Sequence, residues 1–369
     1  MNLPLYADAK DGLKELNTHK GLWFERFLNR YNNQYDWNVE VTDKQNPKKD
    51  WIKEVAGKSG KCGSTDDLKR HALQQHQLCK NLNGKSQIYK NNWHFVTGMG
   101  NPHPVENGLI WHPTLGVPYL SGAAVKGIIR TWIEEWAGYE AAEIKQRSLK
   151  WFGSDQKDSI ENQAGQFIFF DAIPVKEVIL ACDIMTPHMG KWYSNGGNID
   201  QNNFAETVPA DWHSPNIISF LVAKKITLQC CIAPRNKAAE GELKEVMEIL
   251  TLALEYLGAG AKTATGYGRL KPDEKLQTEL DKQIMLENRK TLSPVDAFKE
   301  ELELLNNKQI AEMFGKNFNR TKKTYSENDW KKIIHILLTE KAALIAAWAI
   351  EDNKKSGAFK AYKKIKRYL

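Results

Sequence analysis

The segment Gly258–Arg269 combines four glycines with basic, hydroxyl and aromatic side chains. Glycine tolerates positive φ angles and lets a ligand approach the backbone closely. The residues of this segment that suit ligand contact are Gly258, Gly260, Lys262, Thr263, Thr265, Tyr267 and Arg269. The segment has no Gly-Lys-Ser/Thr triplet and precedes an extended stretch, which excludes a nucleotide phosphate loop and a dinucleotide fingerprint. Its composition favours a sugar-phosphate backbone as ligand, and a structural glycine turn is the alternative.

A second candidate site is the start of a predicted helix at Ser121. Serine is a typical N-cap residue, and the small residues that follow it leave the first backbone N–H groups accessible. Lys126 and Arg130 are four residues apart and share one helix face. The free N–H groups, the helix dipole and the two cations would together attract an anion. A tightly packed helix start without a ligand is the alternative.

Four possible metal ligands lie close together in the sequence, namely Cys62, His71, His76 and Cys79. Their spacing matches none of the usual two-plus-two zinc patterns. We therefore expect neither a metal nor another cofactor, and we interpret this segment as a polar helix with two histidines and a buried thiol.

The elements that position the two candidate sites follow from the hydrophobic pattern. Alternation at Trp93–Thr97 predicts a strand, and a helix is predicted from Ser121 to Gly138. Further elements are the strands Gln166–Phe170, Val178–Met185, Asn216–Val222 and Lys225–Ile232, the helix Glu242–Leu257 and an extended segment from Gly268. This order predicts an α+β fold with a four-stranded antiparallel sheet and helices on one face, as in the ferredoxin-like or RNA-recognition topology.

Composition predicts three regions: a polar, mostly helical N-terminal region (1–90), the ferredoxin-like core with long loop insertions (91–272), and a helical, basic C-terminal region (273–369). The chain has 41% hydrophobic and 26% charged residues, which excludes a mainly disordered protein. The net charge of +7 lies entirely in residues 275–369, where 20 Lys and Arg oppose 13 Asp and Glu. Such a balance permits a polyanionic partner.

The cysteines and the apolar runs indicate the cellular compartment of the protein. Five cysteines are an odd number, and the charged N-terminal stretch does not have the pattern of a secretion signal. The longest apolar run, Ala342–Ile350, is too short for a bilayer span. We therefore expect a cytoplasmic protein with free thiols that does not contact a membrane.

Several segments, taken in order, resemble the RAMP superfamily of CRISPR proteins. Gly116–Arg130 resembles the family segment G-x-P-Y-x-P-G-S-S-x-K-G-x-x-R, and Gly258–Arg269 is similar to the C-terminal glycine-rich loop of that family. Trp151–Ser154 followed by Gly165–Pro174 is similar to the intervening F-G … G-x-x-x-F-x-D-A-x-P pattern. Where the family has Pro-Gly-Ser-Ser, this chain has Ser-Gly-Ala-Ala, so the resemblance implies backbone contacts at that helix start.

Two further segments, Thr97–Gly108 and Asp183–His188, resemble the sixth-subunit family of the type III-B Cmr effector complexes. The resemblance covers about residues 90–272. It implies a subunit for antiviral defence that holds the guide (CRISPR) RNA toward its 3′ portion, with the paired target RNA, at the end of the filament. The implied protein partners are other Cmr-complex subunits, including the repeated backbone subunit. Phosphate contacts of this kind are sequence-blind, since base pairing reads the sequence.

One more group of residues suits base stacking or wedging, and it comprises His188, Lys191, Trp192 and Tyr193. Packing within a loop is the alternative interpretation of these side chains.

The resemblance also raises the question of catalysis, because relatives of this fold include ribonucleases. In the related filament subunit, cleavage depends on an Asp in the loop between the first strand and the first helix, and here that loop, Gly98–Leu120, contains none. The loop holds His103 and His112, and Asp183 and His188 form another possible pair. Flanking prolines favour a structural role for the loop histidines, so we expect no catalysis. A guide-RNA-processing endoribonuclease and an architectural subunit without RNA contact are the alternatives.

Overall fold

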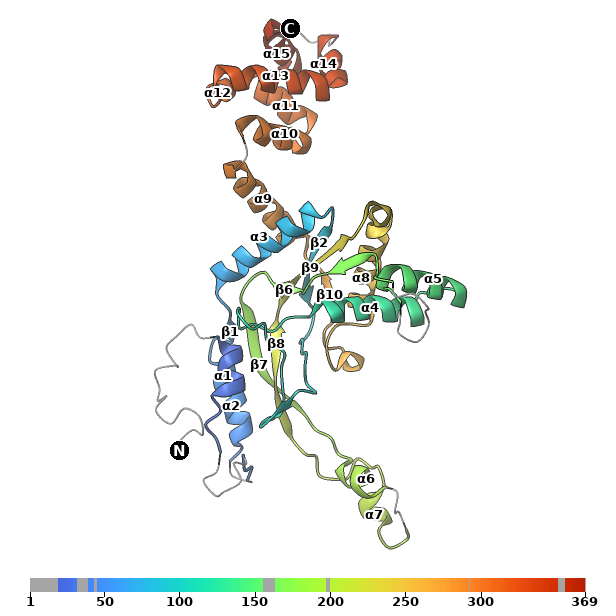
Figure 1. Ribbon diagram of the computed structural model, residues 1–369. Coiled ribbons are helices and arrows are strands. Elements are labelled where there is room, and N and C mark those ends of the chain that lie inside the picture. Colours follow the sequence, from blue (N-terminus) through green and yellow to red (C-terminus); the bar gives the residue numbers. More distant parts are fainter. Residues whose placement is uncertain are drawn as a thin grey trace. The chain divides into compact units, whose positions relative to one another are not determined.

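The computed structural model describes residues 19–31, 39–42, 45–154, 163–196, 200–291, 293–350 and 356–368 (Figure 1). The chain forms two compact units, Met1–Gln277 and Thr278–Leu369. Each unit has a hydrophobic core of its own. Among the described helices, none has both the length and the apolar character needed to cross a membrane.

The larger unit is built on an antiparallel sheet with the strand order β10-β2-β9-β5. Its elements are β2 (Lys85–Asn91), α4 (Gly122–Glu135), β5 (Phe167–Phe169), β6 (Ile173–Pro174), β9 (Thr227–Pro234), α8 (Leu243–Tyr256) and β10 (Leu270–Pro272). The main strands alternate with the two helices as β2-α4-β5-β9-α8-β10, and β6 also pairs with β9. In space the fourth strand is followed by the first, the third and the second. This is the ferredoxin-like arrangement, so the predicted α+β class is confirmed.

The first strand of this fold lies earlier in the chain than the sequence indicated. Along β2, Ile88 pairs with Gln229 and Tyr89 with Leu228 on β9. The predicted strand Trp93–Thr97 is instead an extended segment that follows β2 and makes a single bridge to strand β8. The hydrophobic pattern did not predict β2, because most side chains of this strand are polar. The sheet therefore includes residues before position 91, where the sequence pattern suggested a boundary.

Helices cover both faces of the sheet rather than the one face that we predicted. The central strand β9 is buried along its whole length. Its residues Cys230 and Ile232 belong to the main core, together with side chains of α4 and α8. The alternate residues Cys231 and Ala233 pack with Cys79 of helix α3 (Thr65–Asn81). The alternation of side chains along a strand explains how β9 supplies two cores.

A second antiparallel sheet has the order β1-β7-β8. It contains β1 (Lys61–Cys62), β7 (Val178–Met185) and β8 (Ile218–Lys225), and helix α2 (Pro47–Ala56) packs against β7 and β8. Beyond the paired ends of β7 and β8, the chain forms a lobe with helices α6 (Gly190–Asn195) and α7 (Phe204–Thr207), here called the hairpin lobe (Figure 1). The remaining elements of this unit are α1 (Lys20–Arg26), β3 (Pro102–His103), β4 (Glu106–Asn107), α5 (Ala141–Phe152), η2 (Lys237–Glu242) and η3 (Thr263–Thr265).

The smaller unit is helical, as predicted for the end of the chain. Helix α9 (Glu274–Thr291) leads into it, followed by α10 (Pro294–Leu304), α11 (Asn307–Phe314), α12 (Phe318–Lys322), α13 (Glu327–Glu340), α14 (Ala342–Ala349), α15 (Gly357–Ile365) and η4 (Lys366–Tyr368). Lys341 separates helix α13 from helix α14. The buried indole of Trp330 stacks with Phe314 and lies edge-on to Phe318, so the core of this unit is aromatic.

Candidate nucleic-acid interface

An open groove of about 560 Å³ lies between α4, the segment after strand β2 and the glycine-rich loop that precedes β10. Its lining residues are Thr97, Gly98, Met99, Gly100, Leu120, Ala124, Gly127, Ile128, Thr131, Leu257, Gly258, Gly260, Ala261 and Thr263. All of these side chains are uncharged, and several are glycines that expose backbone. The structure thus brings the predicted helix start and the predicted glycine loop to the two walls of one groove.

The glycines of the loop serve close backbone packing. Gly260 has a φ of 87°, and a Cβ added there would lie 2.1 Å from the carbonyl oxygen of Val96. The N–H of Ala261 donates to the same carbonyl at 2.7 Å, and the N–H of Gly268 donates to the carbonyl of His94 at 2.8 Å. These contacts explain why positions 260 and 268 need glycine. Gly258, Gly260 and Thr263 of the same loop also line the groove, so their contacts with RNA stay predictions.

Lys262 lies next to the groove lining with its ammonium against aromatic rings. Its backbone is left-handed, with a φ of 59°, and the hydroxyl of Thr265 donates to its carbonyl at 2.8 Å. The Nζ atom is 5.6 Å from the ring centroid of Phe220 and 5.9 Å from that of Tyr267. Within the described part of the chain, Lys262 forms no ion pair with a carboxylate. Its charge is therefore held by cation–π contacts and is not neutralised.

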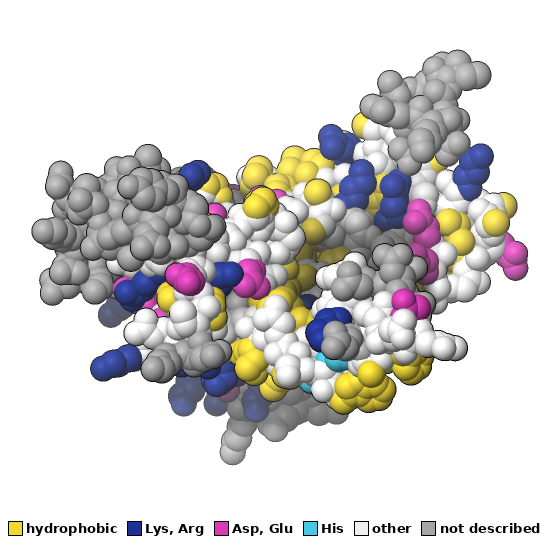
Figure 2. All heavy atoms as spheres, turned by 90° about the horizontal axis from the view of Figure 1, so that it is seen from below, with side chains coloured by type: hydrophobic (Ala, Val, Ile, Leu, Met, Phe, Trp, Pro, Cys, Tyr) yellow, Lys and Arg dark blue, Asp and Glu magenta, His cyan; other side chains and the backbone are white. Residues whose placement is uncertain are grey.

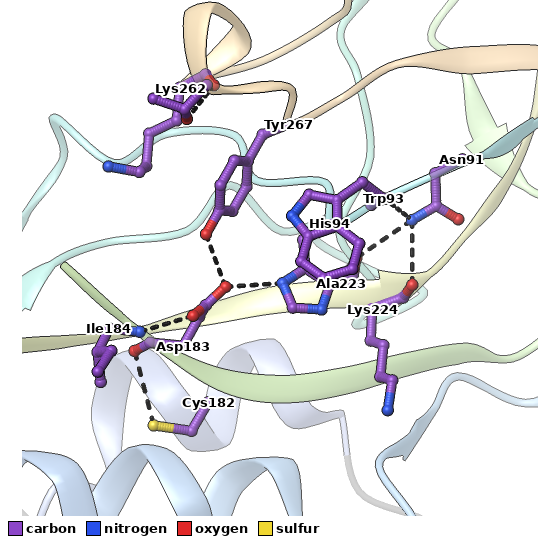
Figure 3. Close-up of polar contacts among 11 residues, drawn as sticks. Asn91, Trp93, His94, Cys182, Asp183, Ile184, Ala223, Lys224, Lys262 and Tyr267 are labelled. Carbon is purple, nitrogen blue, oxygen red and sulfur yellow. Dashed lines mark hydrogen bonds and ion pairs between the residues drawn. The ribbon is translucent and has the colours of Figure 1, made fainter.

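A polar network below the loop joins three segments of the chain (Figure 3). The Oδ2 atom of Asp183 on β7 accepts a hydrogen bond from the hydroxyl of Tyr267 at 2.6 Å and lies 2.7 Å from Nδ1 of His94. The ring of Trp93 stacks on His94 at 4.5 Å. Burial alone would raise the pKa of Asp183, but the hydrogen bonds from Tyr267 and His94 outweigh it and lower that pKa. Burial, and then Asp183 itself, raises the pKa of Tyr267.

Sequence reasoning missed His94 because the residue falls in a stretch that we interpreted only as a strand. The pair that we did consider, Asp183 and His188, is not brought together. Nδ1 of His188 instead lies 3.1 Å from the carbonyl oxygen of His213 in the hairpin lobe.

The structure places Lys126 and Arg130 away from the groove, on another face of α4 than the residues that line it. Nζ of Lys126 donates to the carbonyl of Phe152 at 2.8 Å, and the guanidinium of Arg130 lies 5.3 Å from the centre of the Phe152 ring. Burial, and then the charge of Arg130, lowers the pKa of Lys126. Arg269 donates to the carbonyl of Glu255 at 3.0 Å. The predicted contacts of these three cations with RNA stay predictions.

The predicted stacking residues His188, Lys191, Trp192 and Tyr193 lie in the hairpin lobe (Figure 1), and none of them lines the groove. Tyr193 is 78% exposed, and the lobe adds two aromatic residues that sequence reasoning missed, Phe204 and Trp212, the latter 70% exposed. Hydrophobic side chains are also exposed on the face of the molecule shown in Figure 2. The Gly- and Asn-rich sequence around these aromatic residues is typical of a surface loop and could have indicated that their rings are exposed.

The candidate catalytic histidines of the loop after β2 have local partners. Nε2 of His103 lies 3.1 Å from the carbonyl oxygen of Phe24, and the two rings stack at 4.0 Å. Nδ1 of His112 accepts from the N–H of Leu115 at 3.2 Å. Burial lowers the pKa of both histidines, and both side chains hold the loop in place.

The four possible zinc ligands also have separate contacts. The thiol of Cys62 donates to the carbonyl of Gly116, Nδ1 of His76 lies 2.6 Å from the hydroxyl of Ser86, and Cys79 contacts the carbonyl oxygen of Ile232. The ring of His71 lies edge-on to that of His112. No three His, Cys, Asp or Glu residues of the described ranges form a group that could hold a metal ion.

The sequence was compared with protein families and with known proteins. Residues 93–271 match the family model of the RAMP superfamily. The particular relatives are Cmr6 subunits. The CRISPR system Cmr subunit Cmr6 of Pyrococcus furiosus is 28% identical over 254 residues, which cover 55% of this chain and 72% of the relative. The Cmr6 subunit of Saccharolobus solfataricus is 26% identical over 164 residues, which cover 44% of this chain and 47% of the relative.

One solved structure with a similar chain is that of the type III-B Cmr-beta bound to cognate target RNA. The similarity covers 63% of this chain and 77% of the other, with 18% identity and a TM-score of 0.46. The resemblance to the Cmr6 family that the sequence indicated is confirmed by the named relatives.

Proposed function

We propose that this chain is a non-catalytic RNA-binding subunit of a type III-B CRISPR (Cmr) effector complex. In this proposal it holds the guide RNA toward its 3′ portion, with the paired target RNA, at the end of the filament and beside the repeated backbone subunit. The proposal draws on the match to the RAMP superfamily and on the homology to Cmr6 subunits. The single observation that carries it is the open groove between α4 and the glycine loop.

The lining of the groove suits the backbone of RNA better than its bases. Thr131 and Thr263 line the groove, and neither hydroxyl has a hydrogen-bond partner within the described residues. Hydroxyls and exposed backbone can bind ribose and phosphate oxygens without reading sequence. Lys262 precedes Thr263 in the chain, and no carboxylate of the described residues neutralises its charge. Specificity would then come from pairing between guide and target.

The hairpin lobe would supply the second type of contact. Its exposed Tyr193 and Trp212 rings are of the kind that stack on unpaired bases. His103 and His112 have local partners that hold the loop after β2, which favours the binding role over the endoribonuclease alternative.

The groove is tested with a glutamate at Gly127. A Cβ added at Gly127 meets no atom within 4 Å, so the variant Gly127→Glu should fold and place a carboxylate in the groove. Gly241→Glu is the matched control, because Gly241 is equally open but lies outside the groove lining. We expect guide-RNA affinity, measured by filter binding at fixed salt, to fall about tenfold or more for Gly127→Glu, because a phosphate in the groove would face a like charge. Equal affinities of the two variants would contradict the proposal.

A further inference from the structure

The C-terminal unit carries a surface that the groove does not explain. Residues 316–323 and 356–368 contain nine Lys and Arg residues and no Asp or Glu. Seven of these cations have exposed side chains, and one of them, Lys366, lies over the ring of Tyr362. The other six define what we call the basic face: Lys316, Arg320, Lys323, Lys360, Lys363 and Arg367. Lys354 and Lys355 lie outside the described residues.

The two segments of the basic face are held side by side. Nζ of Lys364 on α15 donates to the carbonyl of Gly315 at 2.6 Å and lies 5.4 Å from the ring centroid of Phe318 on α12. Nζ of Lys322 lies 5.7 Å from the ring of Tyr368. The cations of α12, α15 and η4 therefore form one surface and not two separate charge runs.

The charges on this surface are not neutralised by neighbours. Elsewhere in the protein, cations pair with acids: Lys150 with Glu242, and within the C-terminal unit Lys299 with Glu340 at 3.1 Å. Lys322, at the border of the face, pairs with Glu327 at 3.2 Å. None of the six cations that define the basic face has an acidic partner within ion-pair distance in the described part of the chain. Like charges gathered in this way repel one another, and a polyanion would relieve that repulsion.

The aromatic rings near the basic face already pack against other side chains of this unit. Tyr368 packs against Phe318 and Trp330, and the ammonium of Lys366 lies over the ring of Tyr362. Of the large hydrophobic side chains in the described part of this unit, only Ile350 is exposed. Single strands are typically held by bases stacking on exposed rings, which this surface lacks. A surface of cations without free rings fits the phosphates of a duplex.

We propose that the basic face binds the phosphate backbone of double-stranded RNA, as a second nucleic-acid contact in addition to the groove. The choice of a duplex depends on the face itself, whereas the choice of RNA over DNA depends on the proposed function. Lys360, Lys363 and Arg367 are spaced three and four residues apart, so they follow one side of α15 and η4 over about 10 Å.

The test uses the full chain with Lys360, Lys363 and Arg367 all changed to Glu. The matched control changes Lys308, Lys331 and Lys332 to Glu, because these lysines are also exposed in the C-terminal unit but lie outside the face. Affinity for a 20-base-pair RNA duplex is measured by fluorescence anisotropy between 50 and 200 mM salt. Each lost phosphate contact flattens the slope of log K against log salt by about 0.9, so the triple variant should flatten it by about two to three. The control should change it by less than one.

Several results would overturn the proposal. These are equal changes of slope in the two triple variants, tighter binding of single-stranded RNA than of the duplex, or tighter binding of duplex DNA. Loss of association with other subunits at unchanged duplex affinity would identify the face as a protein-docking surface instead. Repeating the test with Gln in place of Glu, on variants with unchanged thermal unfolding, excludes misfolding as the cause. The triple Glu variant should keep the guide-RNA affinity that Gly127→Glu lowers, which separates this proposal from that of the groove.

Discussion

At the scale of single residues, the polar side chains with the shortest contacts near the groove hold the fold together. The carboxylate of Asp183 joins β7 to His94, which follows β2, and to Tyr267 in the glycine loop. None of this could be predicted from the sequence, because the three residues are far apart in the chain and no spacing rule connects them. The position of Lys262 could be predicted, but its contacts with the Phe220 and Tyr267 rings could not.

Changing Asp183 to Asn tests this network. The Asn amide carries no negative charge, so it cannot replace the carboxylate as acceptor for both Tyr267 and His94. We therefore expect a loss of about 1 to 3 kcal/mol in the free energy of unfolding at pH 7. The folded-state pKa of Asp183 is lowered, so its contribution is complete above the ordinary pKa of 3.8 and is lost as the pH falls through the folded value. Urea unfolding should therefore show a gap between wild type and variant that closes below about pH 4. Asp211→Asn, an exposed control, should show no comparable gap, and a gap that persists at low pH would contradict this account.

At the scale of elements, local signals predicted the helices and loops of the site but not how they meet. Ser121 caps α4 through its side chain as expected, and the predicted strand Val178–Met185 is β7 itself. The prediction of the first strand at Trp93–Thr97 was wrong, because β2 is mostly polar and is recognisable only by its pairing with β9. The groove depends on that pairing, since β2 positions the segment 97–100 that forms one of its sides. Long-range pairing of this kind leaves no mark on a local hydrophobic pattern.

The close packing of the glycine loop predicts different costs for two alanine substitutions. Gly260→Ala would combine a left-handed φ with a Cβ 2.1 Å from the Val96 oxygen, so we expect a loss of about 2 to 5 kcal/mol. Gly266→Ala is the control, because its φ is also positive but its Cβ would meet no atom within 4 Å. Its cost should be about 1 to 2 kcal/mol from backbone strain alone. Chemical unfolding measures both, and equal costs would show that the contact with Val96 is not as tight as the structure indicates.

At the scale of the whole molecule, two cores allow two functions. The larger unit contains the groove and the residues that match the RAMP superfamily, and the smaller unit has a separate aromatic core that supports the basic face. The charge distribution predicted this division in outline, because the whole excess of positive charge lies after residue 274. The sequence did not show that the cations of α12 and α15 share one surface, since that depends on the packing of Lys364 and Tyr368 around Phe318.

Separate cores predict that damage to one unit spares the other. Trp330 is fully buried at the centre of the smaller core, so Trp330→Ala should cost about 3 to 5 kcal/mol there. Calorimetry should show two thermal transitions in the wild type, of which only the one belonging to the smaller unit shifts downward in the variant. Trp151→Ala, in the core of the larger unit, is the reciprocal control and should shift the other transition. Binding of guide RNA in the groove should survive Trp330→Ala at temperatures between the two transitions, whereas duplex binding by the basic face should be lost. A single transition that shifts as a whole in both variants would mean that the two units fold as one.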